Sequence, residues 1–308
     1  MLKKKLYILI FYFFCFQLNA FVVTSIRPLS FIASAITDGI TDVYSLVPIG
    51  SSPHDYSIKI SDLKKIKNSD LLIWIGPNLE NFLIKVIHNV PKNNVITLMY
   101  DVNIKKMLLK NNSNDFENFY KKRRYQKIDD HLNFHNVNTH IWLSSDIAFI
   151  IAKNIYEKLI ILYPEYQNKL NHNLNVFKKN LKDVNKKIND EFFSLRNKKY
   201  FVFHDAYAYF EQKYNLSSSG YFTINPTIYP GIKTLYKIKK ILNKENISCI
   251  FVEPQFKFSI IESIVKNTNV KIGILDPLGD EISINKNSYL EFLTMLSQQF
   301  KYCLYKNI

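Results

Sequence analysis

Three of the seven histidines lie where a metal site could be built. His54 follows a short apolar run that ends at Pro48, His140 directly precedes a helical pattern, and His204 ends an apolar run. Ligands of open parallel sheets bind at the carboxyl ends of strands, and neutral imidazole is a common zinc ligand. Taken singly, each histidine is a weak signal, since a lone histidine after a strand is more often structural.

The spacings of these histidines do not identify a site by themselves. They are 86 and 64 residues apart, and the chain contains no compact motif such as His-Glu-x-x-His or Cys-x-x-Cys. Whether the histidines converge therefore depends on the elements that position them.

Short apolar runs alternate with amphipathic stretches along the chain, a pattern typical of parallel sheets built from strand-helix-strand units. In the first part we expect strands at 21–25, 41–48, 71–75 and 95–99, and helices at 29–38, 60–67 and 79–88. In the last part we expect strands at 200–203, 247–252 and 270–275, and helices at 206–214, 232–243, 260–266 and from 288 to the end.

Between these parts, apolar residues recur every three or four positions from Leu170 to Phe192 without glycine or proline, which predicts one stiff helix. The fold class is therefore α/β, with two lobes that each contain a mainly parallel sheet flanked by helices, joined by one long rigid helix. The predicted parts are a signal peptide (1–20), an N-terminal lobe (21–163) with a polar insertion loop (103–138), the linking helix (164–197) and a C-terminal lobe (198–308).

The N-terminus predicts export. Three lysines, an apolar run from Leu6 to Phe16 and a small residue at Ala20 follow the order of a cleaved signal peptide. Removing it lowers the net charge from +15 to +12. The lysines are scattered among Asn, Ile and Tyr without the aromatic interleaving of a nucleic-acid groove, so we expect no nucleic-acid partner and no membrane anchor. An oxidising compartment leaves Cys249 and Cys303 as a disulfide or as two buried thiols.

Several blocks of sequence resemble one known family. PIGSSPHDY at 48–56, DLLIWIGP at 70–77, HIWLS at 140–144, FHDAY at 203–207, EPQF at 253–256 and LDPLG at 275–279 are similar to the ZnuA family of zinc-binding receptors of ABC transporters. The resemblance covers nearly all of the mature chain.

This resemblance implies a periplasmic Zn²⁺-binding protein, a monomer without enzymatic activity, that delivers its ion to a permease and through it serves an ATPase. It implies that His54, His140 and His204 are the metal ligands and that Cys249 and Cys303 form a disulfide. Pro53 stands where some relatives carry a glutamate, so the fourth ligand is expected to be water or, if the lobes close far enough, Asp276.

Other assignments remain open beside this one. Asp55, Asp205 and Glu253 are candidates to orient the ligand imidazoles, and His131 and His135 could form a helper zinc site in the insertion loop. A manganese or iron receptor would favour carboxylates over three imidazoles. A zinc hydrolase would need a general base and a substrate pocket, and a surface adhesin would use the metal only structurally.

Overall fold

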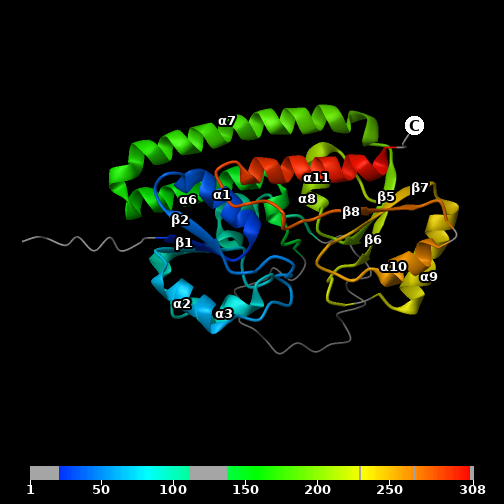
Figure 1. Cartoon of the computed structure of the whole chain (residues 1–308), viewed down its shortest axis with the longest axis horizontal. Coiled ribbons are helices and arrows are strands. Elements are labelled where there is room, and N and C mark those ends of the chain that lie inside the picture. The colour runs from blue at the N-terminus through cyan, green and yellow to red at the C-terminus, as the bar shows by residue number, and fades with distance from the viewer. Residues whose placement is uncertain (1–20, 111–136, 229, 267, 306–308) are drawn as a thin grey trace, which may run out of the picture.

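Two α/β lobes bridged by a long helix make up the protein, as the computed structural model shows (Figure 1). The structure describes residues 21–110, 137–228, 230–266 and 268–305. The predicted signal peptide, most of the predicted insertion loop, and His131 and His135 lie outside these residues. None of the helices among the described residues is both long enough and apolar enough to cross a membrane.

The N-terminal sheet has four parallel strands in the order β2-β1-β3-β4. All residues of the inner strand β3 are buried, which explains its uninterrupted apolar sequence. Val22 and Ile73 share a core with α1 and α6, whereas Val23 and Leu72 pack on the side of α2. The elements of this lobe are β1 (Phe21–Thr24), α1 (Arg27–Thr37), β2 (Asp42–Ser45), α2 (Ile60–Asn68), β3 (Leu71–Trp74), α3 (Ile84–Ile87), β4 (Val95–Thr97), α4 (Val102–Lys105) and α6 (Ser145–Leu162).

The C-terminal sheet is also parallel, in the order β6-β5-β7-β8. Phe203 and Val252 face a core formed with α9 and α10, whereas Tyr200 and Phe251 face the side of α11. The elements of this lobe are β5 (Lys199–His204), α8 (Ala208–Tyr214), β6 (Gly220–Thr223), α9 (Ile232–Lys244), β7 (Ile247–Val252), α10 (Ser259–Val265), β8 (Lys271–Ile274) and α11 (Ser288–Leu304).

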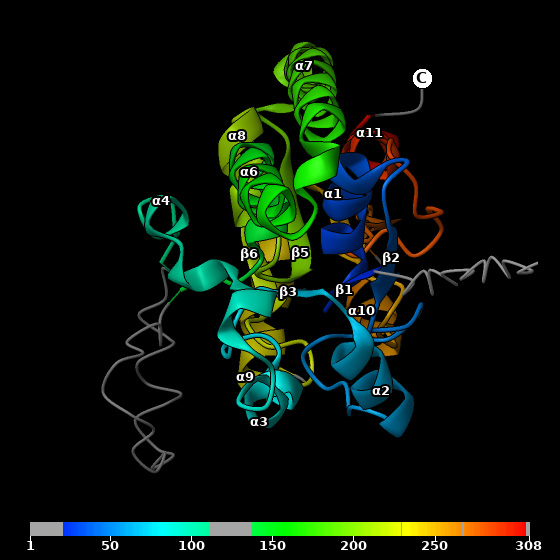
Figure 2. The ribbon, with the colours of Figure 1, turned by 90° about the vertical axis from the view of Figure 1, so that its left-hand side faces the viewer.

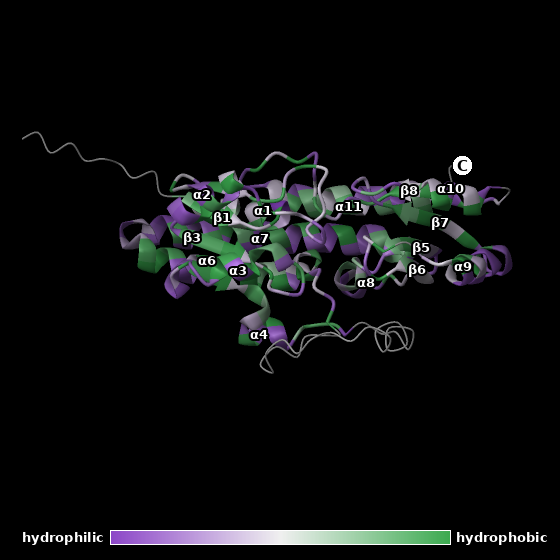
Figure 3. Ribbon diagram, turned by 90° about the horizontal axis from the view of Figure 1, so that it is seen from below, coloured by the Kyte–Doolittle hydropathy of each residue, from purple (hydrophilic) through white to green (hydrophobic). Residues whose placement is uncertain are grey.

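The two lobes repeat one topology without a visible sequence repeat. Each sheet places its strands in the order second, first, third, fourth, so α1 corresponds to α8, α2 to α9 and α3 to α10. Seen from below, α2 and α9 lie at opposite corners and α3 and α10 at the other two (Figure 3). A half-turn therefore exchanges the lobes, with α7 on the opposite face from α2 and α9 (Figures 1 and 2).

Helix α7 (Gln167–Phe192) bridges the lobes. Its buried residues, which include Leu170, Phe177, Ile188 and Phe192, lie on one amphipathic face. They belong to a core cluster that contains residues of both sheets, so the lobes share one packed interior on this side. This arrangement confirms the predicted fold class, while the domain boundaries at 164 and 197 remain predictions.

Helix α11 belongs to both lobes, which its position at the end of the chain did not indicate. It packs against β8, and it also contacts α1 and α7. The rings of Phe31 and Phe292 lie 6.0 Å apart. A disulfide between Cys249 and Cys303 joins β7 to the last turn of α11, as the family resemblance implied.

Two local expectations were wrong. The predicted helix at 79–88 is a 3-10 turn (Asn81–Leu83) followed by the single turn of α3. The edge strand β6 was missed, because it is short, begins with glycine and has only one fully buried residue.

Candidate metal centre

The three histidines come from three separate segments of the chain. His204 is the last residue of β5, His54 lies in the long loop between β2 and α2, and His140 precedes the 3-10 turn that leads into α6. Ser144 caps α6 by accepting a hydrogen bond from the Ile147 amide, which fixes the start of the helix just after His140.

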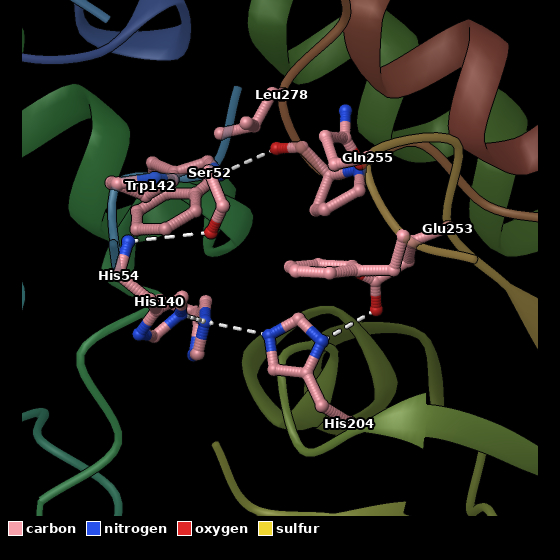
Figure 4. Close-up of a pocket in the computed structure, with 11 residues that line it drawn as sticks. Ser52, His54, His140, Trp142, His204, Glu253, Gln255 and Leu278 are labelled. Carbon is pink, nitrogen blue, oxygen red and sulfur yellow. Dashed lines mark hydrogen bonds and ion pairs between the residues drawn. The ribbon is translucent and has the colours of Figure 1, made fainter. Parts of the chain in front are cut away.

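The imidazoles converge with their Nε2 atoms toward one point (Figure 4). The Nε2 atom of His140 lies 3.3 Å from that of His54 and 3.0 Å from that of His204. Nitrogens bound to a tetrahedral Zn²⁺ at about 2.0–2.1 Å are about 3.3–3.4 Å apart. The three rings are therefore spaced for a shared small cation.

Two of the imidazoles are oriented by acceptors on their other nitrogen. The Glu253 Oε1 atom lies 2.5 Å from His204 Nδ1, and Asn138 Oδ1 lies 2.8 Å from His140 Nδ1. Asn138 is itself fixed, since its Nδ2 group donates to the Asp205 carbonyl. An acceptor at Nδ1 places the proton there and leaves the Nε2 lone pair free to bind a metal.

The surroundings keep two of the rings neutral. Burial, together with the nearby His204, lowers the pKa of His54 to about 3. Burial also holds the pKa of His140 well below its ordinary value, with both neighbouring histidines contributing. At neutral pH these rings are unprotonated, which is the form that ligates metal.

The cavity beside the histidines is small, about 10 Å³ in volume. Its walls come from both lobes and include Pro53 and Trp142 on one side and Phe256 and Leu278 on the other. A single water molecule needs about 10–15 Å³. The cavity therefore accommodates an ion or a water molecule and excludes organic molecules.

Of the acidic residues considered from the sequence, only Glu253 contacts a histidine ring of the cluster. Glu253 contacts His204 as anticipated, whereas Asp55 is exposed and Asp205 uses its main-chain carbonyl to hold Asn138. The Asp276 carboxylate accepts hydrogen bonds from Gln255, Leu278 and Asp280, so it is not part of the histidine cluster.

Asn138 is the site residue that sequence reasoning missed. Its position two residues before His140, in a polar stretch that leads into a helix, was the available signal. Asparagine is so frequent in this chain that the position alone did not distinguish it.

Known proteins resemble this chain in sequence and in fold. The family model described as zinc-uptake complex component A, periplasmic, matches residues 22–303. The high-affinity zinc uptake system protein ZnuA of Haemophilus ducreyi is 41% identical over 291 residues, which cover 93% of this chain and 94% of that protein. The protein of the same name from Yersinia pestis is 41% identical over 292 residues, with 93% and 92% coverage. A crystal structure of ZnuA has a TM-score of 0.77 at 21% identity, covering 93% of this chain and all of that one, and shows the shared fold.

Proposed function

The chain belongs to the family of periplasmic zinc-uptake components, and on this premise we propose that His54, His140 and His204 together hold the Zn²⁺ ion that it carries. The protein is the high-affinity zinc-binding component of an uptake system. The convergence of three imidazoles, whose ligand atoms all lie within 4.8 Å of one another, is the observation that carries the ligand assignment. Residues 1–20 act as the export signal and are removed.

The chemistry of the ligands favours zinc over manganese or iron. Three neutral imidazoles suit Zn²⁺, whereas Mn²⁺ prefers carboxylate and other oxygen ligands. Within the described part of the chain, the cluster contains no carboxylate. Glu253 contributes through His204 rather than to the ion itself.

Water completes the coordination sphere in this proposal. Asp276 is buried, and its two oxygens together accept three hydrogen bonds, two of them from main-chain amides of the turn at 276–280. Moving this carboxylate to the ion would leave those buried donors unpaired, at a cost of about 1–3 kcal/mol each.

The same site argues against a hydrolase. A metal hydrolase needs a general base beside the bound water and room for its substrate. The buried Glu253 carboxylate is committed to His204 Nδ1, and the cavity of about 10 Å³ has no space for an organic substrate. The protein is a receptor, and it releases the ion unchanged.

The receiving partner is a membrane permease that engages both lobes. The first residues of α2 and α9, Ile60 and Ile232, are each 86% exposed and occupy equivalent positions in the repeated topology. Both helices lie on the face opposite α7 (Figures 1 and 2). Single exposed apolar residues are common on protein surfaces, so it is their occurrence at equivalent positions of the two lobes that supports a contact surface.

Lysines surround both isoleucines. The exposed lysines of α2 are Lys64, Lys65 and Lys67, and those of α9 are Lys233, Lys237, Lys239, Lys240 and Lys244. Two equivalent basic and apolar surfaces related by a half-turn fit a partner built from two like subunits with acidic rims.

Calorimetry tests the ligand assignment. Zn²⁺ and Mn²⁺ are titrated into the mature protein, into a variant with alanine at positions 54, 140 and 204, and into a control with the exposed His88 and His172 replaced by alanine. We expect one tight zinc site and weak manganese binding in the wild type and the control, and no tight site in the triple variant. A triple variant that still binds zinc tightly would disprove the ligand assignment.

Binding to the host's zinc permease, reconstituted in nanodiscs, tests the docking surface. Ile60→Glu and Ile232→Glu should each weaken the complex to a similar extent, while zinc binding stays intact. Ile161→Glu, at a position on α6 that is 74% exposed, serves as the control and should behave as the wild type. If the double variant with both Ile60→Glu and Ile232→Glu binds like the wild type, the permease docks elsewhere.

A further inference from the structure

The loop that carries His54, residues 46–59, forms neither helix nor strand. After His54 it is held within its own lobe, where the Tyr56 hydroxyl donates to Asp62 Oδ2 at 2.7 Å. The loop leaves β2 through main-chain hydrogen bonds from Leu46 and Val47 to the end of β1, and then turns at Gly50, whose φ of +76° favours glycine. The position of His54 therefore depends on contacts made at this turn and after it.

One such contact crosses to the other lobe. The Gly50 amide donates to Asp280 Oδ2 at 3.0 Å, although the two residues are 230 positions apart in the chain. Gly50 lies only four residues before His54, so this bond holds the metal-binding loop against the C-terminal lobe.

Asp280 is held rigidly for this contact. Its own amide donates to Asp276 Oδ2 at 2.6 Å, and Gln255 Nε2 donates to Asp280 Oδ2 at 2.8 Å and to Asp276 Oδ1 at 2.9 Å. Gly279, with φ of +68°, lets the turn pack on Phe31, where a Cβ atom would come within 2.7 Å of the ring. The positive charge of Arg27 faces both carboxylates.

The same network reaches the opposite side of the metal centre. Gln255 lines the metal cavity and follows Glu253 by two residues, and Glu253 holds His204. Hydrogen bonds and short chain segments thus connect His54, through Gly50, Asp280, Gln255 and Glu253, to His204. A bound ion would link His54 directly to His204 and so add a second connection between the lobes.

We propose that Asp280 is a positioning residue that latches the His54 loop to the C-terminal lobe and thereby slows release of the bound ion. This inference rests on the proposed zinc site. The Gly50 amide is exposed, so water can replace the lost acceptor, and the bond is worth about 0.5–1.5 kcal/mol. Loss of the latch should therefore accelerate zinc dissociation roughly twofold to tenfold.

Stopped-flow dissociation of Zn²⁺ into an excess of chelator measures this effect. Asp280→Ala should release zinc roughly twofold to tenfold faster. Asp280→Asn keeps an acceptor oxygen without the charge, and it should give a smaller acceleration. Lys213→Ala is the matched control, because it removes another bond between the lobes, 2.7 Å to Asp146, that is remote from the His54 loop.

A double-variant cycle separates positioning from general stability. His54→Ala alone should release zinc faster, and adding Asp280→Ala to it should change the rate no further, because the latch acts through His54. Thermal melting of the metal-free variants reports on folding, so that even if Asp280→Ala is unstable the Asp280→Asn comparison decides.

Any one of three results would contradict the proposed role of Asp280. Both Asp280 variants could release zinc at the wild-type rate, Lys213→Ala could accelerate release equally, or Asp280→Ala could accelerate release as much in the His54→Ala background as in the wild type. Absence of tight zinc binding in the wild type would instead count against the proposed function.

Discussion

Replacing Glu253 by glutamine tests how far the charge behind His204 contributes to zinc affinity. Glu253 is 2% exposed and its Oε1 atom lies 2.5 Å from His204 Nδ1. Burial raises the pKa of Glu253 and His204 opposes that rise, while a bound cation further favours the carboxylate. Glutamine has the same shape and still accepts the hydrogen bond, so the variant removes only the charge.

The magnitude follows from the kind of hydrogen bond that is exchanged. A charge-assisted bond is worth about 1.5–3 kcal/mol and a neutral one about 0.5–1.5 kcal/mol, so Glu253→Gln should weaken zinc binding by roughly 1–1.5 kcal/mol, or about tenfold. Glu253→Leu leaves the buried Nδ1 donor unpaired and should cost about a hundredfold.

Competition titration against a zinc chelator measures both variants. Glu262→Gln, on the exposed side of α10, is the matched control and should bind zinc as the wild type does. If Glu253→Gln binds zinc with wild-type affinity, or if Glu253→Leu is the milder variant, then Glu253 does not act through the His204 hydrogen bond.

Three further outcomes are expected. Burial raises the pKa of Glu80 from 4.5 to about 7, so its contribution to stability is present below pH 4.5 and is lost as the pH rises through 7. Relative to Glu80→Gln, which does not titrate, the wild type should lose about 3 kcal/mol of unfolding free energy between acid and mildly alkaline pH. Urea midpoints of the two proteins that change in parallel with pH would contradict this prediction. Replacing Cys249 and Cys303 by serine should cost about 2–4 kcal/mol of stability by thermal melting. Zinc affinity should stay unchanged, because Cys249 lies in β7, four residues before Glu253, and a weaker zinc site would contradict that separation. The Trp142 ring lies 5.1 Å from that of His140, so zinc should change tryptophan fluorescence and Trp142→Phe should abolish the change, whereas a signal that survives would have to come from Trp74.

Much of the fold was predictable because its signals are local. Buried strands such as β3 are continuous apolar runs, and the amphipathic spacing of α7 is set by the helical period. The position of His54 after a strand and of His204 at the end of one, together with the family resemblance, led to the prediction that the three histidines are metal ligands. The edge strand β6 was not predictable, since its stability comes from pairing with β5 rather than from its own sequence.

The roles of the acidic residues could not be read from the sequence. Glu253 follows β7 and Asp276 follows the neighbouring strand β8, and both offer the same functional group. Only the tertiary structure decides that Glu253 faces His204 while Asp276 accepts bonds from its own turn and from Gln255. The partner of a carboxylate depends on which donors the folded backbone brings within about 3 Å, and such donors come from distant segments.

Local patterns in the sequence were enough to predict the parallel α/β class, the stiff helix between the lobes and the residue types of the candidate metal centre, because periodicity and side-chain chemistry are local properties. Tertiary structure alone decided that α11 ties the lobes together, that Asn138 orients His140, and that Asp280 reaches Gly50 across the interface. These features depend on the relative placement of segments more than a hundred residues apart or on the exact direction of a polar atom. Both are set by packing of the whole chain.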